Sequence, residues 1–212
     1  MSPVSKGVAM GKMIDGDEFV HDMSDAAESL NCYSFKYETT VYKGRRTVDQ
    51  KGDFCFKKPR QIRVAMTGDY KNGAVAVLTR DGKVRGHLGG ALSPFVMTVQ
   101  AKSDLLLGAN GYPLVDSDFA SMAEVVKGFI KDGMKSQVSE HPLPVDGQAR
   151  KVYVIEILKG PSASELYKRA YIDPETLLPL EWFDYIDGHL FAHTVWTNLV
   201  TNVDLSDDLF KL

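Results

Sequence analysis

The feature that most constrains the fold is an alternation of apolar and polar residues that begins at Tyr33. The residues on its apolar side are Tyr33, Phe35, Tyr37, Thr39 and Val41. This period of two predicts a β-strand with one buried face. A turn at Lys43-Gly44 is expected to return the chain through a second strand that contains Phe54 and Phe56, and residues 61–67 predict a third strand.

Two segments carry the spacing of amphipathic helices instead. Residues 16–30 and 117–131 both repeat apolar residues every three or four positions,. Asp116 or Ser117 is expected to cap the second helix, because a short polar side chain can accept hydrogen bonds from its first turn. Each helix has an apolar face and must bury it against another element.

Further short strands are separated by turn signals. Asp173-Pro174-Glu175-Thr176 predicts a type I turn and Asp187-Gly188 a hairpin turn,. The expected strands cover residues 74–79, 84–88, 95–100, 151–158, 166–172, 180–186 and 189–199. Because the connections are short and show no regular βαβ alternation, we expect an α+β fold with a strongly curved antiparallel sheet and both helices against one face.

Length and composition indicate one domain over residues 1–212, with residues 1–15 loosely ordered. Hydrophobic residues make up 44% of the 212, which is enough for a sizeable core,. The net charge of −3 and the dilution of the local basic clusters argue against a nucleic-acid partner,. No apolar run is long enough for a transmembrane segment.

The opening residues 1–7 have no apolar run and do not form an intact signal peptide,. Two interpretations stay open at this point: a cytoplasmic protein, or a mature form from which an export segment has been removed.

Cys32 and Cys55 are the two cysteines of the chain. If Lys43-Gly44 forms a two-residue turn, these cysteines lie opposite each other on neighbouring strands. A disulfide would indicate an oxidising compartment. The alternative is two buried, inert thiols.

The sequence offers few of the convergent polar groups that an enzyme needs. His189 and His193 share a strand face, but about 13 Å separates them, which is too far for one metal ion, and a solvated face is the simpler interpretation. Motifs for zinc hydrolysis, nucleotide binding or a serine nucleophile are missing from the sequence,. We therefore expect a non-enzymatic protein without a cofactor or metal.

Three segments resemble a known superfamily. The hairpin segment 52–63, the turn-bearing segment 171–181 and the following Tyr185-Ile186-Asp187-Gly188 resemble the LolA/LolB-like periplasmic lipoprotein carriers. Tyr112-Pro113-Leu114, which leads into the second helix, is similar to a side branch of that superfamily rather than to its lipoprotein carriers. The similarity extends over nearly the whole chain.

The resemblance implies an open half-barrel whose concave face is covered by helices that act as a lid. It also implies non-catalytic binding of a lipid, acyl chain or lipoprotein in an apolar cavity under that lid, in the periplasm or another extracytoplasmic compartment. The alternative is an envelope sensor or protein-interaction domain with the same fold and no cavity. The side chains expected to line the cavity are Tyr33, Phe35, Tyr37, Phe54, Phe56, Ile62, Val64, Met66, Met97, Phe119, Met122, Val126, Phe129, Ile130 and Trp182.

Overall fold

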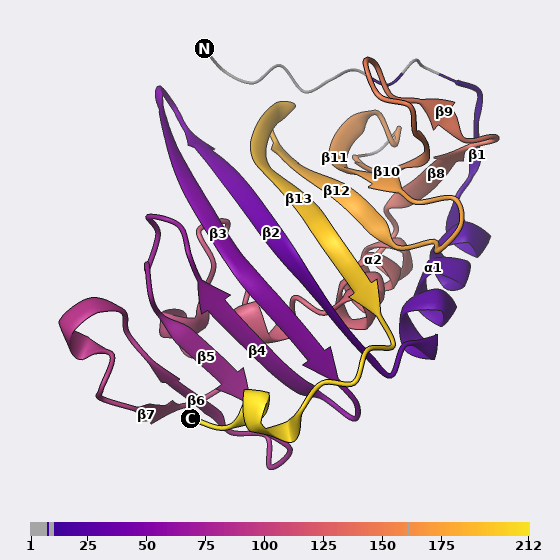
Figure 1. The fold of residues 1–212 in the computed structure, drawn as a ribbon. Helices are drawn as coiled ribbons and strands as arrows, with labels where there is room; N and C mark the ends of the chain where they lie inside the picture. The colour runs from indigo at the N-terminus through magenta and orange to yellow at the C-terminus, as the bar shows by residue number, and fades with distance from the viewer. Residues whose placement is uncertain (1–7, 9–10, 161) are drawn as a thin grey trace.

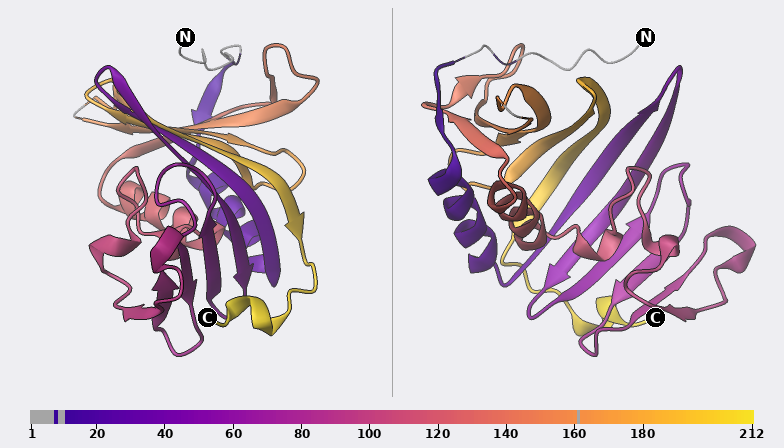
Figure 2. Two further views of the ribbon diagram at one scale, coloured as in Figure 1. Left: turned by 60° about the vertical axis from the view of Figure 1, so that its left-hand side comes forward. Right: turned by 180° about the vertical axis from the view of Figure 1, so that it is seen from behind.

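The protein forms one strongly bent antiparallel sheet with two helices on its concave side (Figures 1 and 2). The structure, a computed structural model, describes residues 8, 11–160 and 162–212. Within these residues the sheet has 13 strands and does not close into a barrel. The expected α+β class, with a curved antiparallel half-barrel and helices over its concave face, is confirmed.

The strand order is β1-β8-β10-β11-β12-β13-β2-β3-β4-β5-β6-β7, with β9 paired to β10 beside this path. The last long strand, β13, therefore pairs with the first long strand, β2, at the centre of the sheet. The strands are β1 (Met13–Asp15), β2 (Cys32–Lys43), β3 (Arg46–Lys57), β4 (Gln61–Met66), β5 (Val75–Leu78), β6 (Val84–His87), β7 (Met97–Val99), β8 (Lys135–Ser139), β9 (Leu143–Pro144), β10 (Lys151–Lys159), β11 (Glu165–Ile172), β12 (Pro179–Ile186) and β13 (His189–Thr201).

Strands β1 and β8 were not expected from the sequence. Both are short, and β1 belongs to the stretch 1–15 that was expected to be loosely ordered. Residues 1–7 and 9–10 of that stretch lie outside the described residues. The expected strand at 95–100 is shorter in the structure, where it covers Met97–Val99.

Helices α1 (Asp17–Ser29) and α2 (Phe119–Lys131) agree with the expected segments, but the expected cap of α2 is wrong. Asp118 is the N-cap, and its carboxylate accepts hydrogen bonds from the Ser121 backbone N at 3.0 Å and from Ser121 Oγ at 2.6 Å. The reason is that residues 114–116 form a separate 3-10 turn, η3, so the first α-helical turn starts later than the sequence pattern indicated,.

The predicted cross-strand pairing of the two cysteines is also wrong. The β2–β3 hairpin pairs Lys43 with Arg46, so its central turn residues are Gly44 and Arg45. Gly44 has φ of +63°, and a glycine with positive φ at the first central position specifies this kind of two-residue turn,. The register shifts by two residues, Cys32 lies opposite Lys57 rather than Cys55, and both thiols are free.

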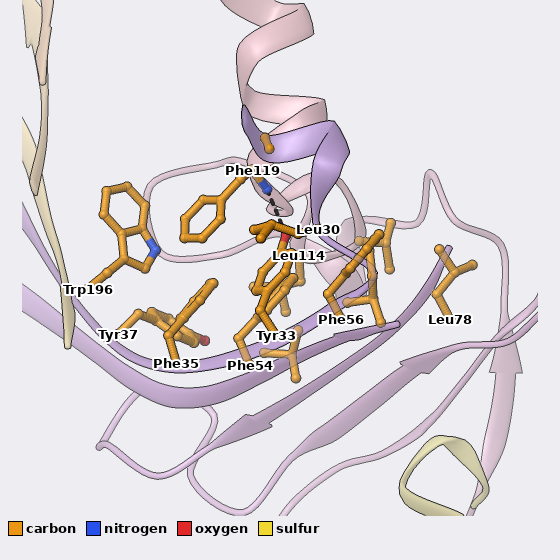
Figure 3. Close-up of a cluster of buried hydrophobic side chains, with 14 of the residues drawn as sticks. Leu30, Tyr33, Phe35, Tyr37, Phe54, Phe56, Leu78, Leu114, Phe119 and Trp196 are labelled. Atoms are coloured by element: carbon orange, nitrogen blue, oxygen red, sulfur yellow. Dashed lines mark hydrogen bonds between the residues drawn. The ribbon is translucent and has the colours of Figure 1, made fainter. Parts of the chain in front are cut away.

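The largest core cluster lies on the concave face, where β2, β3 and β4 meet the start of α2 (Figure 3). Tyr33, Phe35, Phe54 and Phe119 form a connected aromatic group whose ring centroids lie 4.6–6.2 Å apart. The Tyr33 hydroxyl accepts a hydrogen bond from the Phe119 backbone N at 2.9 Å. This bond attaches the first turn of α2 to the sheet.

A second cluster joins both helices to β8, β10 and β11 through residues such as Val20, Val126 and Ile155. A third lies around Tyr171 and Phe183. His193 stacks on Phe183 with ring centroids 4.2 Å apart, and it lies 3.0 Å from Glu181. The expected solvated position of His193 is therefore wrong, because the imidazole packs on a neighbouring ring.

Candidate ligand cavity

A cavity of about 90 Å³ lies between the concave face of the sheet and the segment that runs from residue 110 through η3 into α2. The sheet supplies its floor through β2, β3, β4, β11, β12 and β13. Leu114, Met122 and Val125 close it from the opposite side. The cavity exists because the sheet curves away from a straight helix, so that side chains of ordinary size do not fill the space between them.

One end of the cavity is apolar. Phe35, Phe54 and Val64 form the floor there, and Trp196 forms an adjacent wall. Phe35 and Phe54 are stacked with centroids 4.6 Å apart and nearly parallel rings. Their contact with Tyr33 and Phe119 joins this end to the main core (Figure 3). The floor of the cavity therefore belongs to the largest core cluster.

Two smaller cavities adjoin the first. One, of about 20 Å³, lies between the helices and β10, β11 and β12, and it shares Met122 and Trp182 with the main cavity. The other, of about 50 Å³, lies towards β5, β6 and β7 and shares Val64 and Leu114. Each of these smaller cavities thus shares lining residues with the main cavity.

The residues predicted to line a cavity fall into three groups. Those at the main cavity are Phe35, Tyr37, Phe54, Val64, Met122 and Trp182. Those at the smaller cavities alone are Phe119 and Val126 in the first, and Met66 and Met97 in the second. Those packed within core clusters instead are Tyr33, Phe56, Ile62, Phe129 and Ile130.

The other end of the main cavity carries a buried ion pair. Lys168 of β11 and Asp184 of β12 are cross-strand partners, with 2.5 Å between Nζ and Oδ1 and side chains that are 3% and 8% exposed. Lys168 also donates a hydrogen bond to the Tyr112 hydroxyl, and Trp182 Nε1 donates to Asp184 Oδ1 at 3.1 Å. The Nζ atom also lies 4.8 Å from the ring centroid of Tyr167, where cation–π attraction compensates part of the lost hydration,.

Further polar groups continue from this pair across the sheet. Thr194 and Thr39 are cross-strand partners whose hydroxyl oxygens lie 2.9 Å apart. Next to Thr39, Gln50 donates through Nε2 to the Tyr37 hydroxyl at 3.0 Å and accepts from the Ala109 backbone N at 2.6 Å. We call the set Lys168, Asp184, Thr194, Thr39, Gln50 and Tyr37 the polar strip. All six residues line the main cavity.

Burial sets the protonation of the phenols at this site. It raises the pKa of Tyr37 well above the ordinary value, and a hydrogen bond from Gln50 offsets only part of this increase. Burial also raises the pKa of Tyr112, and the nearby Asp184 carboxylate raises it further. Both hydroxyls therefore remain protonated at neutral pH and serve as neutral hydrogen-bonding groups.

Sequence reasoning predicted only Tyr37 of the polar strip at the cavity and missed the other five residues, although the chain carries a signal for the buried pair. In β11, Lys168 occupies the same face as the buried Ala170 and Ile172. In β12, Asp184 shares a face with Trp182. A cation and an anion at inward positions of two consecutive strands indicate a buried pair, because neither charge is tolerated there alone.

Fold and cavity together define the class of the protein: an open antiparallel half-barrel with two helices over its concave face and a cavity beneath the second. No family model matches the sequence, and no curated protein matches it. The comparisons that succeed are with solved structures.

An uncharacterized conserved protein from Thermus thermophilus is 10% identical to this chain and superposes with a TM-score of 0.57, over 91% of this chain and 92% of that one. A LolA superfamily protein from Nitrosomonas europaea is 9% identical, with a TM-score of 0.49 over 94% and 98% of the two chains. A DUF1329 family protein from Desulfovibrio piger is 16% identical, with a TM-score of 0.46 over 93% and 98%. The Thermus thermophilus protein therefore shares the overall fold of this chain.

Proposed function

We propose that the protein binds a lipid, an acyl chain or a lipoprotein acyl group in the main cavity, without catalysis, in an extracytoplasmic compartment of the cell envelope. The observation that carries the proposal is the cavity itself, with an apolar end of Phe35, Phe54, Val64 and Trp196. An apolar hollow with a few convergent polar groups is the usual form of a small-molecule site in proteins.

The cavity is too small to accept a long acyl chain without a change in conformation. About 90 Å³ is less than the roughly 150 Å³ of an engineered cavity that accepts benzene,. A long acyl chain therefore needs the three hollows to merge, which requires an outward shift of α2 or of the segment 110–117. Met122 and Leu114 each line the main cavity together with one of the smaller cavities, so a merger would take place at these side chains.

The described residues contain no group of three His, Cys, Asp or Glu side chains that could hold a metal ion. In the same residues, no helix is both long and apolar enough to cross a membrane. The titratable pair at the cavity, Lys168 and Asp184, is internally compensated and hydrogen-bonded.

The direct test is to purify the protein without delipidation, extract it with organic solvent and identify bound molecules by mass spectrometry. A fluorescent acyl probe then measures affinity in the emptied protein. Val125→Trp should weaken probe binding about tenfold or more, since Val125 lines the cavity and is 40% exposed, so that a larger ring blocks the entrance without disturbing the core,.

Val200→Trp is the matched control, because Val200 is similarly exposed and lies on β13 outside the cavity lining. It should leave probe affinity unchanged. Recovery of no lipid from the native protein, together with no response to the probe, would show that the cavity is not a binding site.

A second candidate function is docking to another envelope protein. It is favoured by apolar side chains that are 37–66% exposed around the segment between β6 and β7. These residues are Leu88, Leu92, Phe95, Val96, Met97 and Leu105. Three of them, Leu88, Met97 and Leu105, line the same small cavity, and exposed apolar patches often mark protein-binding surfaces.

The same region contains Lys83, Arg85 and Lys102, and the sequence has no acidic residue from 82 to 103. The matching partner is therefore an apolar segment with acidic flanks. A crosslinker attached at position 95 should link this protein covalently to one partner protein. The same crosslinker attached at position 200 should not capture that partner. Purified partner should then bind at least tenfold more weakly to Phe95→Ser, and unchanged affinity would exclude this surface.

A further inference from the structure

The charge of the polar strip restricts the head group that the cavity accepts. Lys168 and Asp184 form a pair with side chains 3% and 8% exposed, so their charges compensate each other at short range. An anionic head group placed beside this pair finds no net positive charge and still loses its hydration. The strip is therefore unsuited to a carboxylate or phosphate and suited to an uncharged polar group.

The hydrogen bonds of the strip leave one acceptor unused. Asp184 Oδ1 accepts from both Lys168 Nζ and Trp182 Nε1. No described residue donates to Asp184 Oδ2, and this oxygen is not among the sealed buried atoms that lack a partner. Since Asp184 is 6% exposed and lines the cavity, its free oxygen is accessible to a ligand in the cavity.

The strip also leaves donors unused, one of them in the threonine pair. Thr39 and Thr194 share a single hydrogen bond, in which one hydroxyl donates and the other accepts. The proton of the accepting hydroxyl has no partner among the described residues. Both threonines are buried, at 4% and 8% exposed, and both line the cavity. Buried polar groups without partners are uncommon, and a bound ligand is one way of satisfying them.

From this arrangement we infer that the cavity selects an amphiphile whose head is an uncharged hydroxyl group, such as a fatty alcohol or a monoacylglycerol. The ligand hydroxyl donates to Asp184 Oδ2 and accepts from the threonine pair, while its chain lies against Phe35 and Phe54. The inference rests on the proposed function and specifies the class of ligand for the same site.

The test compares ligands that differ only in the head group. Decanol, decanoate and decyl phosphate compete with the fluorescent acyl probe for the emptied protein at a mildly alkaline pH, with decanol below its solubility limit and the two anions below their micelle concentrations. Decanol should displace the probe at a concentration about tenfold or more below that needed for the two anions, because its hydroxyl can donate to Asp184 Oδ2 and accept from the threonine pair without adding charge.

Asp184→Asn gives a sharper result, since it leaves the buried Lys168 cation without its carboxylate. Decanoate should then supply the missing negative charge, and the preference should reverse in favour of the acid. Asp53→Asn is the matched control: it makes the same change in net charge at a side chain that is 45% exposed on β3 and outside the cavity lining. This control should retain the preference for decanol.

Each outcome separates the two levels of the proposal. If the probe does not bind and no ligand competes, the proposed function itself fails. If the probe binds but the three head groups compete equally, or an anion competes best with the native protein, the hydroxyl preference is wrong and apolar binding remains. If circular dichroism shows that Asp184→Asn does not fold, Thr39→Val provides the second measurement. This variant should bind decanol severalfold more weakly than the native protein and bind decanoate with unchanged affinity.

Discussion

Removing one member of the Lys168–Asp184 pair should destabilise the protein far more than removing both. The two charged atoms lie 2.5 Å apart, and the side chains are 3% and 8% exposed. Asp184→Leu leaves a buried ammonium and Lys168→Met leaves a buried carboxylate. Each change should lower the free energy of unfolding by about 3–5 kcal/mol, which is the usual consequence of an uncompensated buried charge.

The double variant Lys168→Met/Asp184→Leu should recover most of that loss. Two apolar side chains of similar size remove the charges together, and such replacements are often neutral or stabilising by about 1–4 kcal/mol. One loss remains in the double variant, because Trp182 Nε1 no longer has its acceptor at Asp184. The double variant should therefore be more stable, by several kcal/mol, than the sum of the two single losses predicts.

Urea unfolding followed by tryptophan fluorescence measures these energies directly. Trp182 and Trp196 are the two tryptophans of the chain, and both line the main cavity, so the signal comes from the site itself. The exposed pair Lys12–Glu140, with side chains 71% and 37% exposed, is the control, and its removal should change stability little,. Single losses below about 1 kcal/mol, or a double variant as unstable as the sum of the singles, would refute the description of Lys168–Asp184 as a desolvated pair.

Three further results are expected. Gly52→Ala should lower the free energy of unfolding in urea by about 1–3 kcal/mol, because a Cβ at this position would lie 2.6 Å from a backbone oxygen of β4,. Gly128→Ala should raise it by about 0.5–1 kcal/mol, because the space around this helical glycine is open and alanine favours the helix,. Asp118→Ala should cost about 0.5–2 kcal/mol through loss of the α2 cap, and an unchanged unfolding midpoint would contradict this assignment,. Burial raises the pKa of Tyr33, so the unfolded chain releases this phenol proton at a lower pH than the folded protein does,. The free energy of unfolding should therefore fall as the pH rises above about 10, by about 1.4 kcal/mol per pH unit from this residue. In Tyr33→Phe, unfolding measured over the same pH range should lack this contribution.

The elements with long, regular patterns were predictable from the sequence. The alternation from Tyr33 specifies β2, and the apolar stripes specify α1 and α2 within a few residues. Turns with positive-φ requirements were informative as well, since Asp187-Gly188 takes φ of +49° and +73° between β12 and β13. In these cases local propensity and tertiary packing require the same conformation.

The features that escaped prediction depend on contacts between distant residues. The β2–β3 register depends on which turn position Gly44 occupies, and a shift of two residues keeps every side chain on its face, so the hydrophobic pattern alone does not distinguish the alternatives,. Strand β1 is stable because it pairs with β8. Tyr112 completes the surroundings of Lys168 from a segment with no regular pattern.

The same limit applies to the cavity. Aromatic residues on the apolar face of β2 and β3 were correctly placed on the concave side, yet periodicity does not tell which of them pack against each other and which border empty space. Tyr33 and Phe35 are both inward residues of β2 and both buried, but α2 covers Tyr33 and leaves Phe35 at the cavity. That difference depends on the position of one helix.

The pairing of β13 with β2 has a consequence for how the chain reaches its native state. The two strands come from opposite ends of the sequence, so β2 presents an unpaired edge from the time it is synthesised until the last long strand arrives. Topologies with such distant partners fold slowly, and an exposed edge invites association with other chains meanwhile. Truncation within β13 should therefore yield aggregates rather than a smaller soluble domain, and cellular folding of this protein should depend on chaperones that shield the β2 edge.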